Sequence, residues 1–347
     1  MKLRNLALKD IGWLGRNPKD NPGIISTRIR LARNLRGIQF PYRASEAHLK
    51  KSLEKIFVAC DKSVFFKKSK KIKLDDCSEI DKRLLVERHI ISHEAATSSK
   101  LTGVVIDQKE RLSIIVNEED HIRIQFIEGG LNFFKVWDIL NQIDDDLGKH
   151  LNIAYSEKWG YLTACPTNTG TGMRASSQMH LPGLGMTNGI KTTMENINKM
   201  GMVVRGLYGE GTRVMGNMVQ VSNQVTLGIS ENRIVDSLNR LVVQVAQRED
   251  KVRDKIGKEM LDDLKDMVCR SYGILTSAYR ISIEEALELL SNIRFGVYMG
   301  LLDIEIKTLN NLMIKIQPAH VQEIENRELN PQERNIKRAK IIKEDIG

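Results

Sequence analysis

Three short runs rich in Val and Ile follow one another between residues 100 and 137: LTGVVID, RLSIIVN and IRIQFIEGG. Runs this short, bounded by polar turns, are typical of strands that pair in sequence. Apolar residues at helical spacing precede them at 45–58 and 80–92, and follow them in FFKVWDILNQIDDDLGKHL. We therefore expect an α+β body, an antiparallel sheet flanked by helices. Further short strands are expected near IAYSEKWGYLTAC, GMVVRGLYG and NMVQVSNQVTLG.

The strand pattern stops near residue 230. The stretch from Ser230 onward has apolar residues three and four apart and a capping serine at its start. A second helix should begin at Ser282, and the tail PQERNIKRAKIIKEDIG should form a short basic helix. These features predict a catalytic body over residues 1–245 and an all-α C-terminal domain over 246–347.

The bulk composition limits the class of protein. No apolar run is long enough for a membrane span, and the N-terminus lacks the apolar core of a secretion signal. The four cysteines are far apart, which argues against a disulfide framework and against a thiolate zinc site. We therefore expect a cytoplasmic protein. Its net charge of +9 indicates an anionic partner, although the basic run FFKKSKKIK at 65–73 is more typical of a solvated loop.

Two arginines in the motif STRIR are suited to binding an anion. Arg28 and Arg30 in STRIR are two apart, so on a strand both side chains point to one face. Two adjacent guanidiniums repel each other unless an anion lies between them, and the guanidinium fork suits phosphate. An exposed basic edge strand is the alternative interpretation.

Acidic residues occupy the turn in VNEEDHIRIQF, where Glu118, Glu119 and Asp120 precede His121 and Arg123. Acids in a turn are common, so a divalent metal site is a weak inference from this motif alone. His89 and His93 in RHIISHE have a spacing known from zinc ligands, but no third ligand lies at a suitable distance.

Two glycine-containing loops carry further candidate functional residues. In TACPTNTGTGMRASS, Pro166 helps to end a strand at Cys165, and small residues lead to Arg174. A thiol beside several arginines would favour its thiolate form, although a lone cysteine is more often a small buried apolar residue. In VVRGLYGEGTRVMG, Arg205 precedes a loop with Glu210 between glycines. Five arginines suit a triphosphate bound without a P-loop, since no GxxxxGK[ST] motif is present.

Four motifs, STRIR, VNEEDHIR, CPTNTGTGMRA and RGLYGEGT, resemble the signatures of the phosphagen (ATP:guanidino) kinases, the family of creatine and arginine kinases. The resemblance runs from about residue 25 to 235. NQVTLG and the helical C-terminal extension are most similar to bacterial protein arginine kinases of the McsB type. Creatine and arginine kinases have an additional N-terminal domain that encloses a small substrate. Because only 25 residues precede STRIR, we expect a site open to an arginine on a protein.

The resemblance implies a role for each matching residue. Glu119 and Glu210 would hold the acceptor guanidinium, with Glu119 as the first choice of base, and Cys165 would lie beside the reactive nitrogen. The five arginines would bind the ATP phosphates, His89 would contact the adenosine, and Mg²⁺ would be held mainly by phosphate oxygens rather than by protein ligands. The implied nucleotide-binding residues are Ser26, Thr27, Arg28, Ile29, Arg30, His89, Arg123, Arg174, Ala175, Ser176, Ser177, Gln178, Arg205, Gly206, Leu207, Tyr208, Gly209 and Glu210.

The predicted function is transfer of the ATP γ-phosphoryl group to arginine side chains of proteins, giving phosphoarginine and ADP. A kinase of free guanidino compounds and a catalytically silent regulatory or nucleic-acid-binding relative remain alternatives. The intact carboxylates, thiol and arginines argue against the silent relative. Sharply salt-dependent binding of RNA or DNA would be its signature.

The resemblance also implies partners and a product-sensing tail. Phosphoarginine would mark proteins for a Clp-type unfoldase in protein quality control and the stress response. A small zinc-binding activator and a heat-shock repressor would be further partners, and the C-terminal helices would form a homodimer. The tail motif Arg-Asp-x-x-Arg-Ala, which recognises phosphoarginine, reads here Arg334, Asn335, Ile336, Lys337, Arg338 and Ala339. Asn335 can hydrogen-bond a guanidinium but removes the ionic interaction, so product sensing is in doubt.

Overall fold

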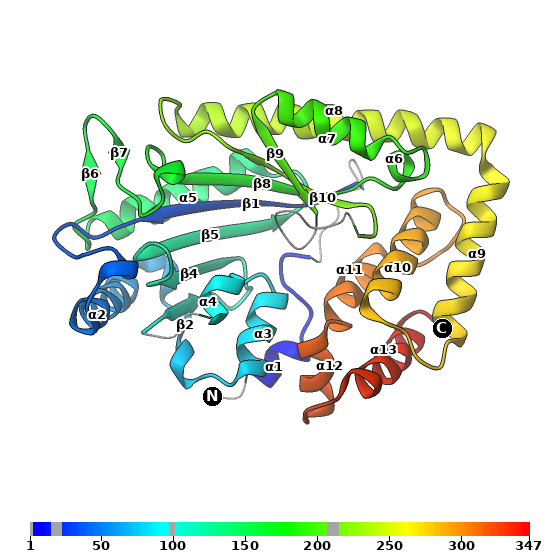
Figure 1. Cartoon of the computed structure of the whole chain (residues 1–347), viewed down its shortest axis with the longest axis horizontal. Helices are drawn as coiled ribbons and strands as arrows, with labels where there is room; N and C mark the ends of the chain where they lie inside the picture. The colour runs from blue at the N-terminus through cyan, green and yellow to red at the C-terminus, as the bar shows by residue number, and fades with distance from the viewer. Residues whose placement is uncertain (1–2, 15–22, 98–100, 207–214) are drawn as a thin grey trace.

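The computed structural model describes residues 3–14, 23–97, 101–206 and 215–347, and its centre is an eight-stranded antiparallel sheet (Figure 1). The strand order is β2-β3-β4-β5-β1-β8-β10-β9. The strands are β1 (Ile24–Arg33), β2 (Lys70–Lys73), β3 (Gly103–Ile106), β4 (Leu112–Val116), β5 (Ile122–Gly129), β8 (Met173–His180), β9 (Met202–Gly206) and β10 (Met218–Asn223). A separate hairpin pairs β6 (Tyr155–Ser156) with β7 (Gly160–Tyr161). The predicted α+β class is confirmed.

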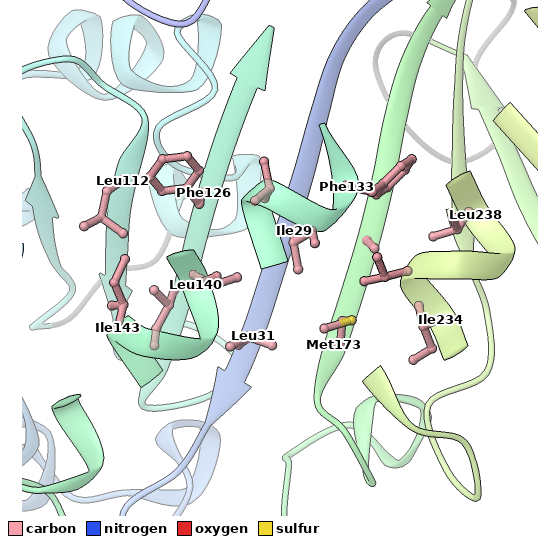
Figure 2. Packing of buried hydrophobic residues seen from close by; sticks show 14 of the residues in the cluster. Ile29, Leu31, Leu112, Phe126, Phe133, Leu140, Ile143, Met173, Ile234 and Leu238 are labelled. Atoms are coloured by element: carbon pink, nitrogen blue, oxygen red, sulfur yellow. The ribbon is translucent and has the colours of Figure 1, made fainter. Parts of the chain in front are cut away.

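Helices α2 (Glu46–Lys62), α5 (Phe133–Gly148) and α8 (Glu231–Glu259) supply the apolar side chains that pack against one face of the sheet. Ile29 and Leu31 of β1 are completely buried in this core. Figure 2 shows them among apolar side chains of α5, such as Leu140, and of α8, such as Ile234. Since side chains alternate along a strand, Arg28 and Arg30 belong to the opposite face of β1.

The other face lies toward α3 (Glu79–Glu87) and α4 (His93–Thr97). A capping box between Ser78 and Asp81 starts α3. The single helix predicted over 80–92 is wrong at its C-terminal end. The helix stops at Glu87, and His89 adopts a left-handed backbone conformation (φ 59°) that no α-helix continues through.

The region after residue 230 is helical, as predicted. It consists of α8, α9 (Leu261–Ser277), α10 (Ile283–Tyr298), α11 (Ile306–Lys315), α12 (Pro318–Glu325) and α13 (Pro331–Ile346). Ser230 and Ser282 accept hydrogen bonds from backbone N–H groups three residues on, which confirms both predicted helix starts. Helices α10 to α13 share an apolar core that includes Leu287 and Leu312, and α12 lies beside α3 (Figure 1). Because α8 continues unbroken through residues 245 and 246, the division there stays a prediction.

The remaining helices are short: α1 (Arg4–Ala7), α6 (Pro182–Met186) and α7 (Ile190–Lys199). The basic run 65–73 is not a loop throughout, because Lys70–Lys73 forms the edge strand β2. Lysines on an edge strand disfavour pairing with another chain, which gives this run a structural role. In the described ranges, no helix combines the length and the apolar character that a membrane crossing requires.

Candidate functional site

Strand pairing brings the five predicted arginines to one face of the sheet. Arg30 lies directly opposite Arg174 of β8, and Ala32 lies opposite Arg123 of β5. Arg205 of β9 joins the same face through Gln220 of β10, which lies opposite both Arg205 and Gln178 of β8. Directly opposite residues of antiparallel strands point to the same side. Since β1 has neighbours on both sides, the edge-strand interpretation of Arg28 and Arg30 is wrong.

One cavity of about 1170 Å³ collects these side chains. It is lined by all five arginines, by Glu119 and Cys165, and by His89. Ser26, Ser176 and Gln178 also line it. Thr27, Ile29, Ala175 and Ser177 alternate with the lining residues along β1 and β8 and are fully buried, so only their backbone is available to a ligand on this side. Gly206 ends β9, while Leu207, Tyr208, Gly209 and Glu210 lie outside the described residues.

The guanidiniums repel one another in the absence of an anion. Burial, together with Arg174 and Arg123, lowers the pKa of Arg28 to about 10. Burial and the neighbouring arginines hold the pKa of Arg30 well below its usual value. The buried Nε atoms of Arg28 and Arg30 have no hydrogen-bond partner among the described residues. A polyanion in the cavity would satisfy these donors and relieve the repulsion.

Two glutamates in the acidic turn after β4 have different surroundings. Arg123 Nη1 donates to Glu118 Oε1 at 3.0 Å, and Arg123 Nη2 lies 2.6 Å from Glu118 Oε2. Ser92 also donates to Glu118, whose side chain is only 4% exposed. Glu119 is 43% exposed, and its Oε2 lies 3.7 Å from Arg123 Nη2. Glu118 therefore orients Arg123, whereas Glu119 is open to a ligand, a distinction that three adjacent acids in the sequence do not reveal.

Several hydrogen bonds hold the Cys165 loop beside Glu119. Asp120 accepts from Asn34 Nδ2 (2.6 Å) and from the Ala164 N–H (2.7 Å), which joins the acidic turn to the start of the loop. Asn168 Nδ2 lies 3.4 Å from Glu119 Oε2. Burial and the nearby Asp120 raise the pKa of Glu119, which makes this carboxylate a better proton acceptor.

The NQVTLG stretch packs against the loop that carries Cys165 and holds it in place. Thr226 Oγ1 lies 2.8 Å from the carbonyl oxygens of both Thr167 and Thr169. Gly170 (φ 112°) meets the backbone of Thr226 so closely that a Cβ there would lie 2.3 Å from its carbonyl oxygen. The Cys165 Sγ lies 2.9 Å from Thr167 Oγ1. The loop that carries the thiol is thus fixed at both ends of its turn.

His89 lies in the part of the cavity that also includes Trp13. The two ring centroids are 5.8 Å apart, and Gln125 Nε2 donates to the His89 carbonyl at 2.6 Å. Burial and Arg28 lower the pKa of His89 to about 3, so the imidazole is neutral and suited to stacking. His93 begins α4 and shares no helix with His89, so the zinc spacing inferred from one helix does not apply. No group of three or more His, Cys, Asp or Glu residues suited to a metal occurs in the described part of the chain.

Arg338 in the tail is buried and forms hydrogen bonds within the C-terminal helical region. It is 1% exposed, and it donates to the carbonyls of Ile316 (2.8 Å) and Ile281 (2.9 Å) and to Asn335 Oδ1 (2.6 Å). Arg334 donates to the Leu329 carbonyl. Ala339 is buried in the helical core. Recognition of phosphoarginine by Arg334, Asn335, Arg338 and Ala339 stays a prediction.

Comparison with known proteins agrees with this geometry. Residues 50–252 match the family described as ATP:guanido phosphotransferase, C-terminal catalytic domain, and residues 261–347 match the protein-arginine kinase McsB C-terminal domain. Protein-arginine kinases from Halothermothrix orenii (43% identity over 99% of both chains) and Clostridium acetobutylicum (40% identity over 96% of this chain and 99% of that one) are among its relatives. A lombricine kinase structure shares the fold, with a TM-score of 0.61 and 22% identity over 74% of this chain and 72% of that chain. The chain therefore belongs to the ATP:guanido phosphotransferases and, among them, to the protein-arginine kinases.

Proposed function

We propose that the protein transfers the γ-phosphoryl group of ATP to the guanidinium of arginine side chains in proteins. The observation that carries this proposal is the single cavity in which five arginines of one sheet face meet an exposed carboxylate and a thiol. The arginines suit a triphosphate, whereas Glu119 and Cys165 suit a cationic acceptor. Membership of the protein-arginine kinases supports the same assignment.

The reaction forms a bond between a guanidinium nitrogen and the γ-phosphorus and breaks the bond between that phosphorus and the β–γ bridging oxygen, so that ADP leaves. A guanidinium is a poor nucleophile because its proton is held tightly and its lone pairs are delocalised. Glu119 would orient the acceptor and accept the proton that the nitrogen loses, and its raised pKa favours that step. We propose Glu210 as the second carboxylate.

In-line positioning and charge neutralisation around the transferred group would supply most of the rate gain. The charge would be neutralised by Arg28, Arg30, Arg123, Arg174 and Arg205. Cys165 would lie beside the reactive nitrogen. We propose Mg²⁺ as part of the nucleotide substrate, ligated mainly by phosphate oxygens and water. The described residues offer no cluster of carboxylates dedicated to it.

The biological setting is proposed from the family. We expect a cytoplasmic enzyme that acts in protein quality control and the stress response. A small zinc-binding activator, a Clp-type unfoldase and a heat-shock repressor would be its partners, and the enzyme would form a homodimer. The basic surface implied by the net charge of +9 suits acidic partners.

The test is incubation of the protein with γ-labelled ATP, Mg²⁺ and casein, in parallel with free L-arginine. We expect acid-labile label on arginine residues of casein, and its loss in Glu119→Gln. Glu157→Gln, an exposed acid on the β6–β7 hairpin, is the matched control and should keep full activity. Label on free arginine alone would make the protein a small-molecule kinase. No label on either acceptor, with ATP still bound, would support the silent relative.

A further inference from the structure

The cavity changes character along its length. Glu119, Cys165 and Asn168 line the cavity. Glu119 lies beside Arg123, which is opposite Ala32 near one end of β1, and Arg30 and Arg28 follow along that strand. Toward the other end of β1, the lining includes the apolar residues Trp13, Ile25, Ile127 and Met218, which belong to one buried cluster. If the γ-phosphate of ATP lies beside the acceptor, the base must lie at this far end, where flat apolar and aromatic groups suit a purine.

Helices of the C-terminal region provide part of that far end. Leu287 of α10, Met313 and Ile314 of α11, and Gln317 and Pro318 at the start of α12 line the same cavity as the arginines. Met313 and Ile314 also pack on the cluster that contains Trp13. The Asn310 Nδ2 of α11 lies 3.4 Å from the carbonyl oxygen of Leu14, the residue after Trp13.

Partly buried hydrogen bonds join this wall to the segment that carries His89. The Glu87 carboxylate accepts from the N–H groups of Ala319 (2.7 Å) and His320 (3.0 Å), and so caps the N-terminus of α12. It also accepts from His320 Nδ1 (2.8 Å), and His320 Nε2 lies 3.3 Å from Arg88 Nη1. Since a guanidinium only donates, His320 Nε2 must accept there, and the ring is neutral. Glu87 and Arg88 immediately precede His89, so the position of α12 and the position of His89 are linked.

We propose that the C-terminal helices form the base-binding wall of the nucleotide cavity, with Ile314 and Met313 facing the base that stacks near Trp13 and His89. The inference rests on the proposed use of ATP. It assigns part of the nucleotide site to the region matching the separate C-terminal domain, and it predicts that changes in α11 alter recognition of the base but not of the phosphates.

The experiment measures direct binding by calorimetry with two probes, ATP and inorganic tripolyphosphate, to the full-length protein. Ile314→Ala should weaken ATP binding about 5-fold through lost apolar contact, and should leave tripolyphosphate binding unchanged. Ile314→Trp should fill the base site and weaken ATP at least about 10-fold, again without affecting tripolyphosphate. Ile306→Ala is the matched control. It lies on the same helix, is half-buried against the C-terminal core and does not line the cavity.

The outcomes separate this inference from the proposed function. Unchanged ATP affinity in both Ile314 variants would overturn it, as would an equal loss of ATP and tripolyphosphate binding. Should either variant melt early, Met313→Ala is compared in the same two titrations. A wild-type protein that binds tripolyphosphate but not ATP would also overturn it. A wild-type protein that binds ATP in this pattern but labels no arginine would contradict only the proposed function.

Discussion

Arg30 of β1 and Arg174 of β8 lie directly opposite each other in the interior of the sheet, with Arg28 two residues away on the same face. Three half-buried guanidiniums in this arrangement oppose folding, because each disfavours the charge of its neighbours. The fold holds them together through the apolar core on the other face of β1. The ligand, rather than the protein, is expected to neutralise them.

Replacing Arg30 by glutamine should therefore have opposite effects on stability and activity. We expect the thermal midpoint of the nucleotide-free protein to rise by about 2 °C, because repulsion is relieved. The increase that ATP produces in the wild type should be largely lost, and kcat/KM should fall at least about 100-fold. Differential scanning calorimetry with and without ATP checks this. A lower midpoint in the nucleotide-free variant would show that Arg30 stabilises the fold.

Glu119→Gln should slow phosphotransfer strongly while leaving nucleotide binding intact. We expect kcat to fall about 10²- to 10⁴-fold, the range for a lost general base, with less than about a 2-fold change in the dissociation constant of ATP. In the wild type, the raised pKa of Glu119 places the acid limb of the rate profile above the usual range of a glutamate. A pH series of kcat/KM and an ATP titration measure both. An acid limb at the ordinary glutamate pKa would exclude Glu119 as the titrating base.

Alkylation should inactivate the enzyme through Cys165. This thiol lines the cavity, whereas burial raises the pKa of Cys60 to about 12 and makes that thiol unreactive. Cys269 is exposed and should also be alkylated, but it lies on α9 and does not line the cavity. Iodoacetamide should therefore inactivate the wild type and Cys269→Ser at equal rates. Peptide mapping should show that MgATP together with an arginine acceptor slows alkylation at Cys165 alone.

Stability should fall on mild acidification because His121 is buried in its neutral form. His121 Nδ1 accepts from the Leu35 N–H (3.3 Å) and Nε2 donates to the Gln39 carbonyl (2.9 Å). Burial lowers its pKa to about 4, below its unfolded value near 6.5. Between these values the unfolded chain binds more protons, so stability is lost as the pH falls from about 6.5 toward 4.

From pH 7 to pH 5 this one histidine should cost about 2 kcal/mol of unfolding free energy. His121→Gln should remove that part of the pH dependence, as measured by urea unfolding at both pH values. His150→Gln, at an exposed position, should keep the full dependence. Equal slopes in wild type and His121→Gln would contradict the prediction.

The structure reproduces the predicted antiparallel sheet, the helical region after residue 230 and the clustering of Arg28, Arg30, Arg123, Arg174 and Arg205. Local patterns carried the first two inferences, because short Val- and Ile-rich runs indicate strands and apolar residues three and four apart indicate helices. The clustering of the arginines was inferred from the motifs taken together and from the family resemblance. The prediction placed the end of α3 too late, because no residue in RHIISHE indicates the left-handed conformation of His89. The role of Glu118 was missed because its partners, Ser92 and Arg123, are identified only by folding.

The sequence by itself determined which reactive groups the protein carries, guanidiniums, carboxylates and a thiol, because residue type fixes the chemical nature of a side chain. It also determined which side chains of each strand share a face, because the period of a strand is two residues. Only the tertiary structure decided that strands far apart in the chain, β1, β5, β8 and β9, bring their arginines to one cavity. It also decided that α10, α11 and the start of α12 line the far end of that cavity. The hydrogen bonds of Glu87 with Ala319 and of Asn310 with Leu14 join residues more than two hundred positions apart. They depend on the packing of whole elements rather than on any local pattern.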